Sequence, residues 1–248
     1  SPDGSRLLVR RVVPTGGSHS ETRWSTMPFE GGAETPLPAT GDIKRVAWSD
    51  SQHVATAVLT SRGLRLAEVD VRTGAQRNAL ELSDSLVADF AALSRGWAWI
   101  PVTRDRVVVA EGGRRREYTP PAWFAAIRQL SSDPSAHRVF YMGFGRATGD
   151  TAAAAVLTLD DGKSAIWATH FAEDARVVAA AAHQAVFAVA TTQDSWSLFG
   201  LDGPGAITPL GTIGRPVFGG SVSRDLTRST IMVMDYRADA WMNQVVVR

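Results

Sequence analysis

The stretch "SPDGSRLLVRRVV" (residues 1–13) places a tight polar turn directly before a run of apolar and basic residues. In such a turn proline presets φ, aspartate hydrogen-bonds to the neighbouring backbone, and glycine accepts a positive φ. The Leu and Val side chains that follow are of the kind that favours a strand. This stretch therefore predicts a turn that leads into a β-strand.

Versions of this turn and strand recur along the whole chain. The turn Ser49-Asp50-Ser51 precedes "HVATAVL" (53–59), and Ser132-Asp133-Pro134-Ser135 precedes "HRVFYMGF" (137–144). The copies recur about every 38 to 49 residues, which is a period typical of repeat architectures. The remaining copies are two degenerate turns and a final one: Ser94-Arg95-Gly96, Ala182-His183 and Ser223-Arg224-Asp225.

Each copy has room for up to four short strands. Hairpins are expected within 64–80 and 154–167, where Gly74 and Gly162 suit tight turns. A period of about 40 to 45 residues with four strands is typical of a β-propeller blade, and one blade cannot bury both of its faces alone. We therefore expect an all-β protein, a β-propeller of about six four-stranded blades whose first and last blades are incomplete. The expected blades of this single domain are 1–40, 41–83, 84–123, 124–173, 174–214 and 215–248.

The composition excludes several classes of function. The chain has 248 residues, no cysteine and a formal net charge of +1. Disulfides, thiolate catalysis and cysteine-based zinc sites are therefore impossible, and the balanced charge argues against a nucleic-acid partner. No apolar stretch approaches the roughly 20 residues that a membrane-spanning helix needs, so no direct membrane insertion is expected.

One basic cluster stands out from this balance. Arg114, Arg115 and Arg116 follow a Gly-Gly pair and precede Glu117. Such a run is usually the solvated flank of a hairpin, and we interpret it in that way. The alternative interpretation is a patch for phosphate or for an acidic partner.

The repeated motifs resemble a known family. An "SPDG" turn before an apolar strand, a third strand that begins with "RW" (23–24) or "DAW" (239–241), and a "GGAETPL" hairpin (31–37) are similar to the TolB-type, WD40-like (PD40) β-propellers. The resemblance extends over the whole chain and implies a bacterial, extracytoplasmic protein, either periplasmic or at the cell surface. It implies no cofactor.

The same resemblance implies a non-enzymatic sensor or scaffold module. Such a module binds a protein, a peptide or another ligand at the mouth of its channel. Similar modules occur beside membrane-tethered Ser/Thr kinase domains, and the C-terminal stretch 221–248 resembles the sensor region of such a kinase. Because an inner strand is missing before Ser1, we expect a fragment of a longer chain, with any membrane tether or catalytic domain outside it.

Six side chains are candidates for ligand binding at the channel mouth. Three histidines stand at or just after inner turns; they are expected to be satisfied turn residues, and the alternative is that they meet a metal or an anion at one rim. One carboxylate stands on an inner strand without a role in a turn, and two aromatic residues after Pro120-Pro121 could form a lid. These candidates are His53, His137, His183, Asp89, Trp123 and Phe124.

Two alternative functions stay open from the sequence. A metal-dependent propeller hydrolase or lyase would need at least three converging carboxylate or imidazole ligands. An accessory propeller of a prolyl-oligopeptidase-type peptidase would leave catalysis to another part of the protein. Neither a G-x-S-x-G nor an H-E-x-x-H motif occurs, so we assign no catalytic and no metal-binding residue.

Overall fold

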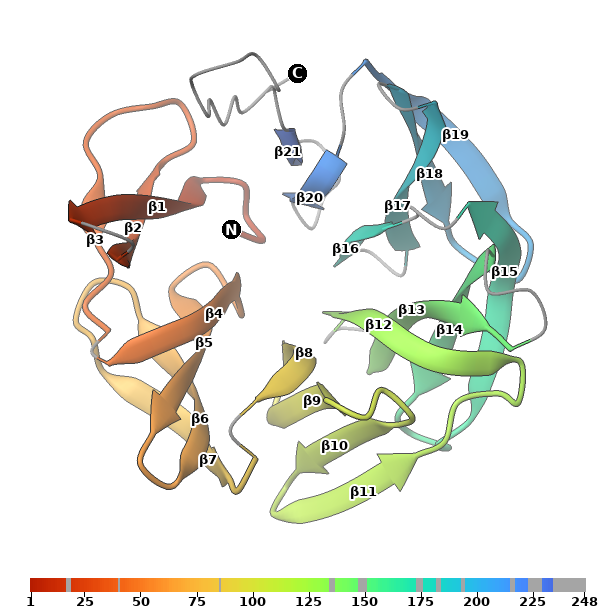
Figure 1. The fold of residues 1–248 in the computed structure, drawn as a ribbon, viewed down its shortest axis with the longest axis horizontal. Helices are drawn as coiled ribbons and strands as arrows, with labels where there is room; N and C mark the ends of the chain where they lie inside the picture. Colours follow the sequence, from red (N-terminus) through yellow and green to blue (C-terminus); the bar gives the residue numbers. More distant parts are fainter. Residues whose placement is uncertain are drawn as a thin grey trace. The chain divides into compact units, whose positions relative to one another are not determined.

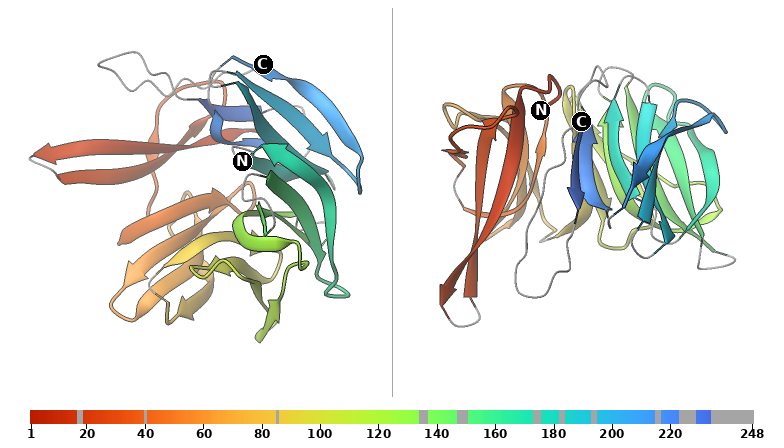
Figure 2. Two further views of the ribbon diagram at one scale, coloured as in Figure 1. Left: turned by 45° about the vertical axis from the view of Figure 1, so that its right-hand side comes forward. Right: turned by 90° about the horizontal axis from the view of Figure 1, so that it is seen from above.

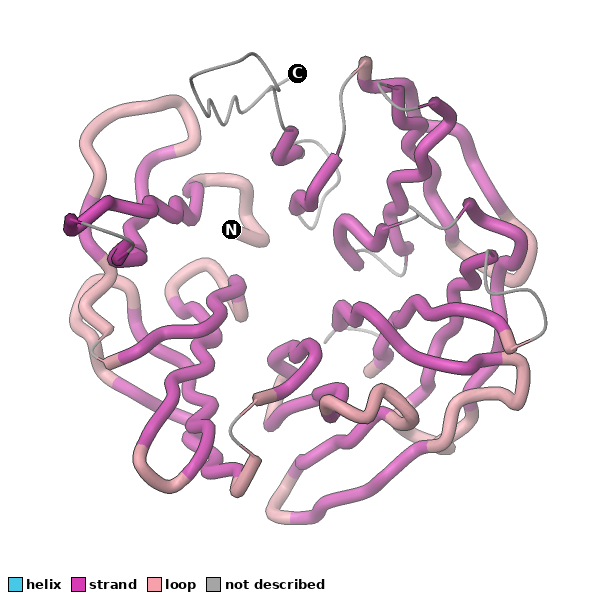
Figure 3. The backbone as a smooth tube through the Cα atoms, viewed as in Figure 1, coloured by secondary structure: helices cyan, strands magenta, loops and turns pink. Residues whose placement is uncertain are grey.

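The computed structural model describes most of the chain as strands and connecting loops. Figure 3 shows no helix among the described residues, and within them no helix is long and apolar enough to cross a bilayer. Two compact units, Ser1–Leu86 and Val87–Arg248, each contain complete sheets. The described residues are 1–16, 19–39, 41–84, 86–133, 137–146, 151–172, 176–181, 184–192, 195–214, 217–222 and 229–233.

The first unit contains a three-stranded and a four-stranded antiparallel sheet, in chain order (Figures 1 and 2). The opening turn is present, since the Gly4 amide donates to the Ser1 carbonyl at 2.9 Å. Val54 and Val69 on neighbouring strands are buried in the core of this unit. The strands are β1 (Arg6–Gly16), β2 (His19–Pro28), β3 (Thr35–Pro36), β4 (Asp42–Trp48), β5 (His53–Thr60), β6 (Gly63–Asp70) and β7 (Gln76–Leu82).

The second unit contains three four-stranded antiparallel sheets and a strand pair, each again in chain order. The first two sheets are β8 (Val87–Leu93), β9 (Gly96–Pro101), β10 (Val107–Glu111), β11 (Arg114–Tyr118), and β12 (Phe124–Asp133), β13 (Arg138–Gly145), β14 (Thr151–Thr158), β15 (Ser164–Ala172). The others are β16 (Arg176–Ala181), β17 (Gln184–Thr192), β18 (Ser195–Leu201), β19 (Ile207–Ile213), and β20 (Val217–Val222) with β21 (Ser229–Val233).

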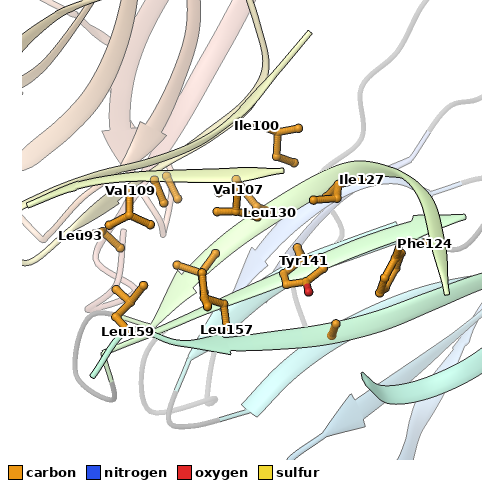
Figure 4. Close-up of a cluster of buried hydrophobic side chains, with 14 of the residues drawn as sticks. Leu93, Ile100, Val107, Val109, Phe124, Ile127, Leu130, Tyr141, Leu157 and Leu159 are labelled. Carbon is orange, nitrogen blue, oxygen red and sulfur yellow. The ribbon is translucent and has the colours of Figure 1, made fainter. Parts of the chain in front are cut away.

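Successive sheets of the second unit pack face to face. Val139 and Tyr141 of β13 belong to the core shared with the preceding sheet, whereas Phe140 and Met142 belong to the core shared with the following sheet. Because neighbouring residues of a strand point to opposite faces, the sheet β12–β15 is covered on both sides. Figure 4 shows the first of these cores, with Ile100 and other side chains of β8–β10 facing those of the next sheet.

These observations confirm the expected all-β class with antiparallel sheets built in chain order. The number of blades was expected to be about six. Five sheets of three or four strands are present among the described residues, and the sixth is the pair β20–β21. The first and last sheets have fewer than four strands. The expected single domain and its blade boundaries stay predictions.

Candidate functional site

A surface pocket of about 230 Å³ lies in the second unit, where the sheet β8–β11 faces the turns of the sheet β12–β15. Val109 and Leu159 form its apolar lining. Its polar lining combines both signs of charge with one aromatic ring. The polar and aromatic residues are Glu111, Arg114, Arg116, Tyr118, His137 and Asp160.

The β10–β11 hairpin sets one wall of this pocket. Its two turn residues, Gly112 and Gly113, have φ of +56° and +75°, which is the conformation of a type I′ turn and is open to glycine. The register pairs Glu111 with Arg114 and Val109 with Arg116. Directly opposed residues share a sheet face, so this face carries the pocket residues of both strands.

His137 forms the opposite wall and is fixed by backbone as well as side-chain contacts. It lies just before β13 with φ of +52°, and its carbonyl accepts a hydrogen bond from the Leu159 amide at 3.0 Å. Its ring Nδ1 lies 2.5 Å from Asp160 Oδ1, and its Nε2 lies 3.0 Å from Glu111 Oε2. His137 therefore links the β10–β11 hairpin to the β14–β15 turn.

This arrangement favours the imidazolium form. A neutral imidazole has one N–H, whereas both ring nitrogens of His137 face a carboxylate. The hydrogen bond with Asp160 raises the pKa of His137 above its usual value of 6.5, burial opposes the shift, and Glu111 adds to it. When protonated, the ring donates to both carboxylates and offsets part of their negative charge.

The three consecutive arginines of β11 have different roles. Arg115 lies over the Trp99 ring, 5.3 Å from its centroid, and pairs with Glu117 at 3.3 Å. Arg114 and Arg116 line the pocket and have no ion pair with any described residue. Two guanidinium groups are therefore left to meet a ligand.

Tyr118 completes the pocket-facing row of β11. A Cβ atom at Gly162 would lie 3.0 Å from Tyr118 Cε1, so the glycine of the β14–β15 turn lets the ring approach closely. Gly162 also has φ of +69°, which agrees with the expected hairpin turn.

The first unit has a pocket of about 250 Å³ with a different character. Arg65 is its single charged lining residue, and Arg65 Nε lies 3.5 Å from Glu81 Oε1. The second-unit pocket is consequently the stronger candidate for a binding site, because Arg114 and Arg116 in its lining have no ion pair with a described residue.

The structure separates the histidines that the sequence grouped together. His137 lines the pocket, but His53 belongs to the first unit and lines neither of the two pockets. The His53 ring contacts Asp50 Oδ1 at 2.9 Å, and Asp50 also accepts from the His53 amide. His53 is thus held by a partner in its own turn, and a ligand contact by His53 stays a prediction. His183 lies outside the described residues.

The remaining candidates have packing contacts and lie outside the pocket. Asp89 Oδ2 accepts a hydrogen bond from the Leu130 amide at 2.9 Å, which joins β8 to β12. Phe124 is 1% exposed and belongs to the core, so the expected lid is not formed by its ring. Trp123 packs on Phe124 edge to face, 5.1 Å between ring centroids. Ligand contacts by these residues stay predictions.

The sequence signalled only part of this site. The arginine run was visible as an alternative acidic-partner patch, and Asp160 stood in an expected turn. Glu111 and Tyr118 carried no signal, because their meeting with His137 depends on how two sheets pack. Glu111 and Asp160 contact opposite ring nitrogens of His137 and do not converge on one point. Among the described residues, no group of three or more His, Asp or Glu side chains is arranged to hold a metal ion.

Comparison with known proteins identifies the architecture. No family model matches the chain, and no curated protein matches its sequence. Solved structures match over nearly the whole chain. TolB from Acinetobacter baumannii is 11% identical with a TM-score of 0.58, and the match covers 98% of this chain and 66% of TolB. The chain has a β-propeller fold.

Two further propeller matches come from proteins of other kinds. Hydrazine synthase from Kuenenia stuttgartiensis is 11% identical with a TM-score of 0.61, and the match covers 94% of this chain and 72% of that one. The tricorn protease is 10% identical with a TM-score of 0.57; all of this chain matches only 35% of it. At these identities the likeness concerns the fold alone, since one propeller fold supports many functions.

Proposed function

We propose that this β-propeller is a non-catalytic binding module, the sensor or scaffold part of a larger bacterial protein outside the cytoplasm. Its ligand is a protein or a peptide with an acidic group, bound at the pocket of the second unit. One observation carries the proposal: Arg114 and Arg116 point unpaired guanidinium groups at a pocket that also holds Tyr118. Arginine and tyrosine are enriched where proteins bind partners.

The surroundings of the pocket support binding over catalysis. The lining contains no Ser, Thr, Cys or Lys nucleophile among the described residues, and the two carboxylates are held by His137. The likeness to TolB is compatible with a binding role, whereas the likeness to hydrazine synthase and to the tricorn protease shows that enzymes use similar propellers. The site, and not the fold, therefore supports this proposal.

Peptide-library panning tests the proposal directly. The full chain is immobilised and panned with a phage-displayed library of random dodecapeptides, and clones are counter-screened on the R114E/R116E variant. We expect enriched clones that bind the unchanged chain and lose binding to the variant. The proposal fails if no clone is enriched or if the enriched clones bind both proteins equally.

Metal analysis of the purified protein provides a second test. The metal-dependent hydrolase or lyase predicts a tightly held divalent ion in stoichiometric amount, whereas a binding module of the proposed kind predicts none. One calcium or zinc ion per chain that survives dialysis would overturn the proposal in favour of an enzyme.

A further inference from the structure

Strand β11 is an edge strand whose outer backbone is unpaired. It is the terminal strand in the order β11-β10-β9-β8, and β10 takes one of its two edges. No backbone hydrogen bond joins residues 114–118 to any described residue other than β10. A row of N–H and C=O groups of this kind is a template for one more strand.

The side chains of β11 are arranged with alternation. Arg114, Arg116 and Tyr118 face the pocket, while Arg115 is held on the opposite face by Trp99 and Glu117. The charges that remain unpaired on β11 therefore stand two residues apart on one face. This spacing is the one at which a neighbouring strand presents its own alternate side chains.

We infer that β11 accepts an acidic peptide in extended conformation as an added strand. Acidic residues at alternate positions of the peptide lie opposite Arg114 and Arg116, within the roughly 5 Å that separates cross-strand neighbours. The acidic side chains pair with the two guanidinium groups on the pocket face. The peptide backbone forms hydrogen bonds with the unpaired edge of β11. This inference rests on the proposed binding function and specifies its ligand.

Charge and geometry favour a peptide over a polyanion such as a nucleic acid. The net charge of the chain is only +1, and Glu111 and Asp160 line the same pocket as the two arginines. A phosphate backbone carries a negative charge at every nucleotide, so these carboxylates repel it strongly. A peptide whose acidic side chains alternate with neutral ones brings fewer negative charges near them. A phosphate backbone also offers no amide N–H to the strand edge.

A simpler role for the arginines is protection of the edge against self-association. Charged side chains on edge strands commonly prevent pairing with a second copy. Protection requires only repulsion between like strands, and it predicts no affinity for a complementary strand. The two interpretations therefore differ in whether an acidic strand binds.

Fluorescence polarisation with a defined peptide separates these interpretations. The probe is fluorescein-labelled VEVEVEV, titrated with the full chain at low salt. We expect saturable binding that is weakened at least tenfold by R114E/R116E and by the neutral R114Q/R116Q. The matched control, R62E/R95E, makes the same charge change at exposed positions outside the pocket and should keep the affinity within twofold.

Two further probes test the strand geometry. The peptide VVEEEVV has the same composition without alternation and should bind at least fivefold more weakly. An oligothymidylate of twelve nucleotides should not compete with the peptide. Equal binding of both peptides, or competition by the oligonucleotide, would overturn the inference in favour of a general anion patch. Circular dichroism and melting curves of the variants establish that they are folded.

The failure of this inference is distinct from the failure of the proposed function. If VEVEVEV does not bind while panned clones still require Arg114 and Arg116, the pocket binds ligands but β11 does not accept an acidic strand. If neither the clones nor the peptide require these arginines, both proposals are wrong.

Discussion

His53 begins β5 in the first unit and His137 directly precedes β13 in the second, and their surroundings differ. His53 belongs to a partly exposed network within its own sheet: Asp50 contacts it, Arg77 joins Asp50 at 2.6 Å, and Arg77 Nε also lies 3.0 Å from the buried Glu68. His137 belongs to the rim cluster, in which Glu111 and the exposed Asp160 hold a partly exposed ring beside a pocket. The charged residues of the His53 turn are bound by partners from their own sheet, which is a structural role. The His137 turn faces a neighbouring sheet, and side chains beside it remain available to bind a ligand.

Loss of Glu68 should have the largest effect on stability, because it removes the buried carboxylate of this network. Glu68 is 2% exposed and accepts hydrogen bonds from Ser49, Arg77 and Asn78. We expect Glu68→Ala to lower the free energy of unfolding by about 2 kcal/mol in urea denaturation, because the hydrogen bonds to its carboxylate are lost while Arg77 stays partly exposed to water. Glu81→Ala, at an exposed position of the same unit, should cost less than about 0.5 kcal/mol. Similar costs for both variants would contradict the proposed structural role of the network.

A pair of aspartate variants sharpens the contrast between the two turns. Asp50 accepts from the amides of Gln52 and His53, so Asp50→Ala should cost about 1.5 kcal/mol of unfolding free energy. Asp160 is 71% exposed at its side chain, so Asp160→Ala should cost about 0.5 kcal/mol or less. If chemical denaturation shows a larger loss of stability for Asp160→Ala than for Asp50→Ala, the distinction between the Asp50 turn and the Asp160 turn is wrong.

The Asp50 contribution should also depend on pH. Burial acts to raise the pKa of Asp50, but the hydrogen bonds from Gln52, His53 and Arg77 outweigh it and lower the pKa below its usual 3.8. A carboxyl group with a lowered pKa stabilises the fold above its unfolded pKa. The stability difference between the unchanged chain and Asp50→Ala should therefore shrink as the pH falls below about 3.8.

The rim cluster should show the opposite pH dependence. Because the pKa of His137 is raised above 6.5, its imidazolium contributes stability below pH 6.5 and loses it as the pH rises through the folded pKa. His137→Asn keeps a residue that tolerates the positive φ. We expect this variant to be less stable than the unchanged chain by about 0.5 kcal/mol at pH 5.5 and equal to it at pH 9. A difference that grows with pH in denaturation curves would contradict this assignment.

The smallest effect on stability is expected at the arginines that face the pocket. Arg114 and Arg116 are exposed and have no ion pair with any described residue, so R114Q/R116Q should change the free energy of unfolding by less than about 0.5 kcal/mol. The same variant should lose peptide binding. A large destabilisation in thermal melts would show that these arginines are structural.

The local structure was largely predictable. The turn at Ser1–Gly4, the strand that begins at His53 and the hairpin turn at Gly162 are all present, because turn chemistry and short apolar runs act over a few residues. The packing of Phe124 was not predicted. The Pro120-Pro121 pair before it carried no information on which sheet its ring would meet.

The sequence by itself determined a repeated unit of antiparallel strands, and with it the need for each sheet to be covered by a neighbour. Only the tertiary structure decided that Glu111, Arg116 and His137 share one pocket. The physical reason is one of range. Backbone preferences and apolar alternation are properties of adjacent residues, whereas a site between two sheets depends on side chains that come together only after both sheets have formed and packed.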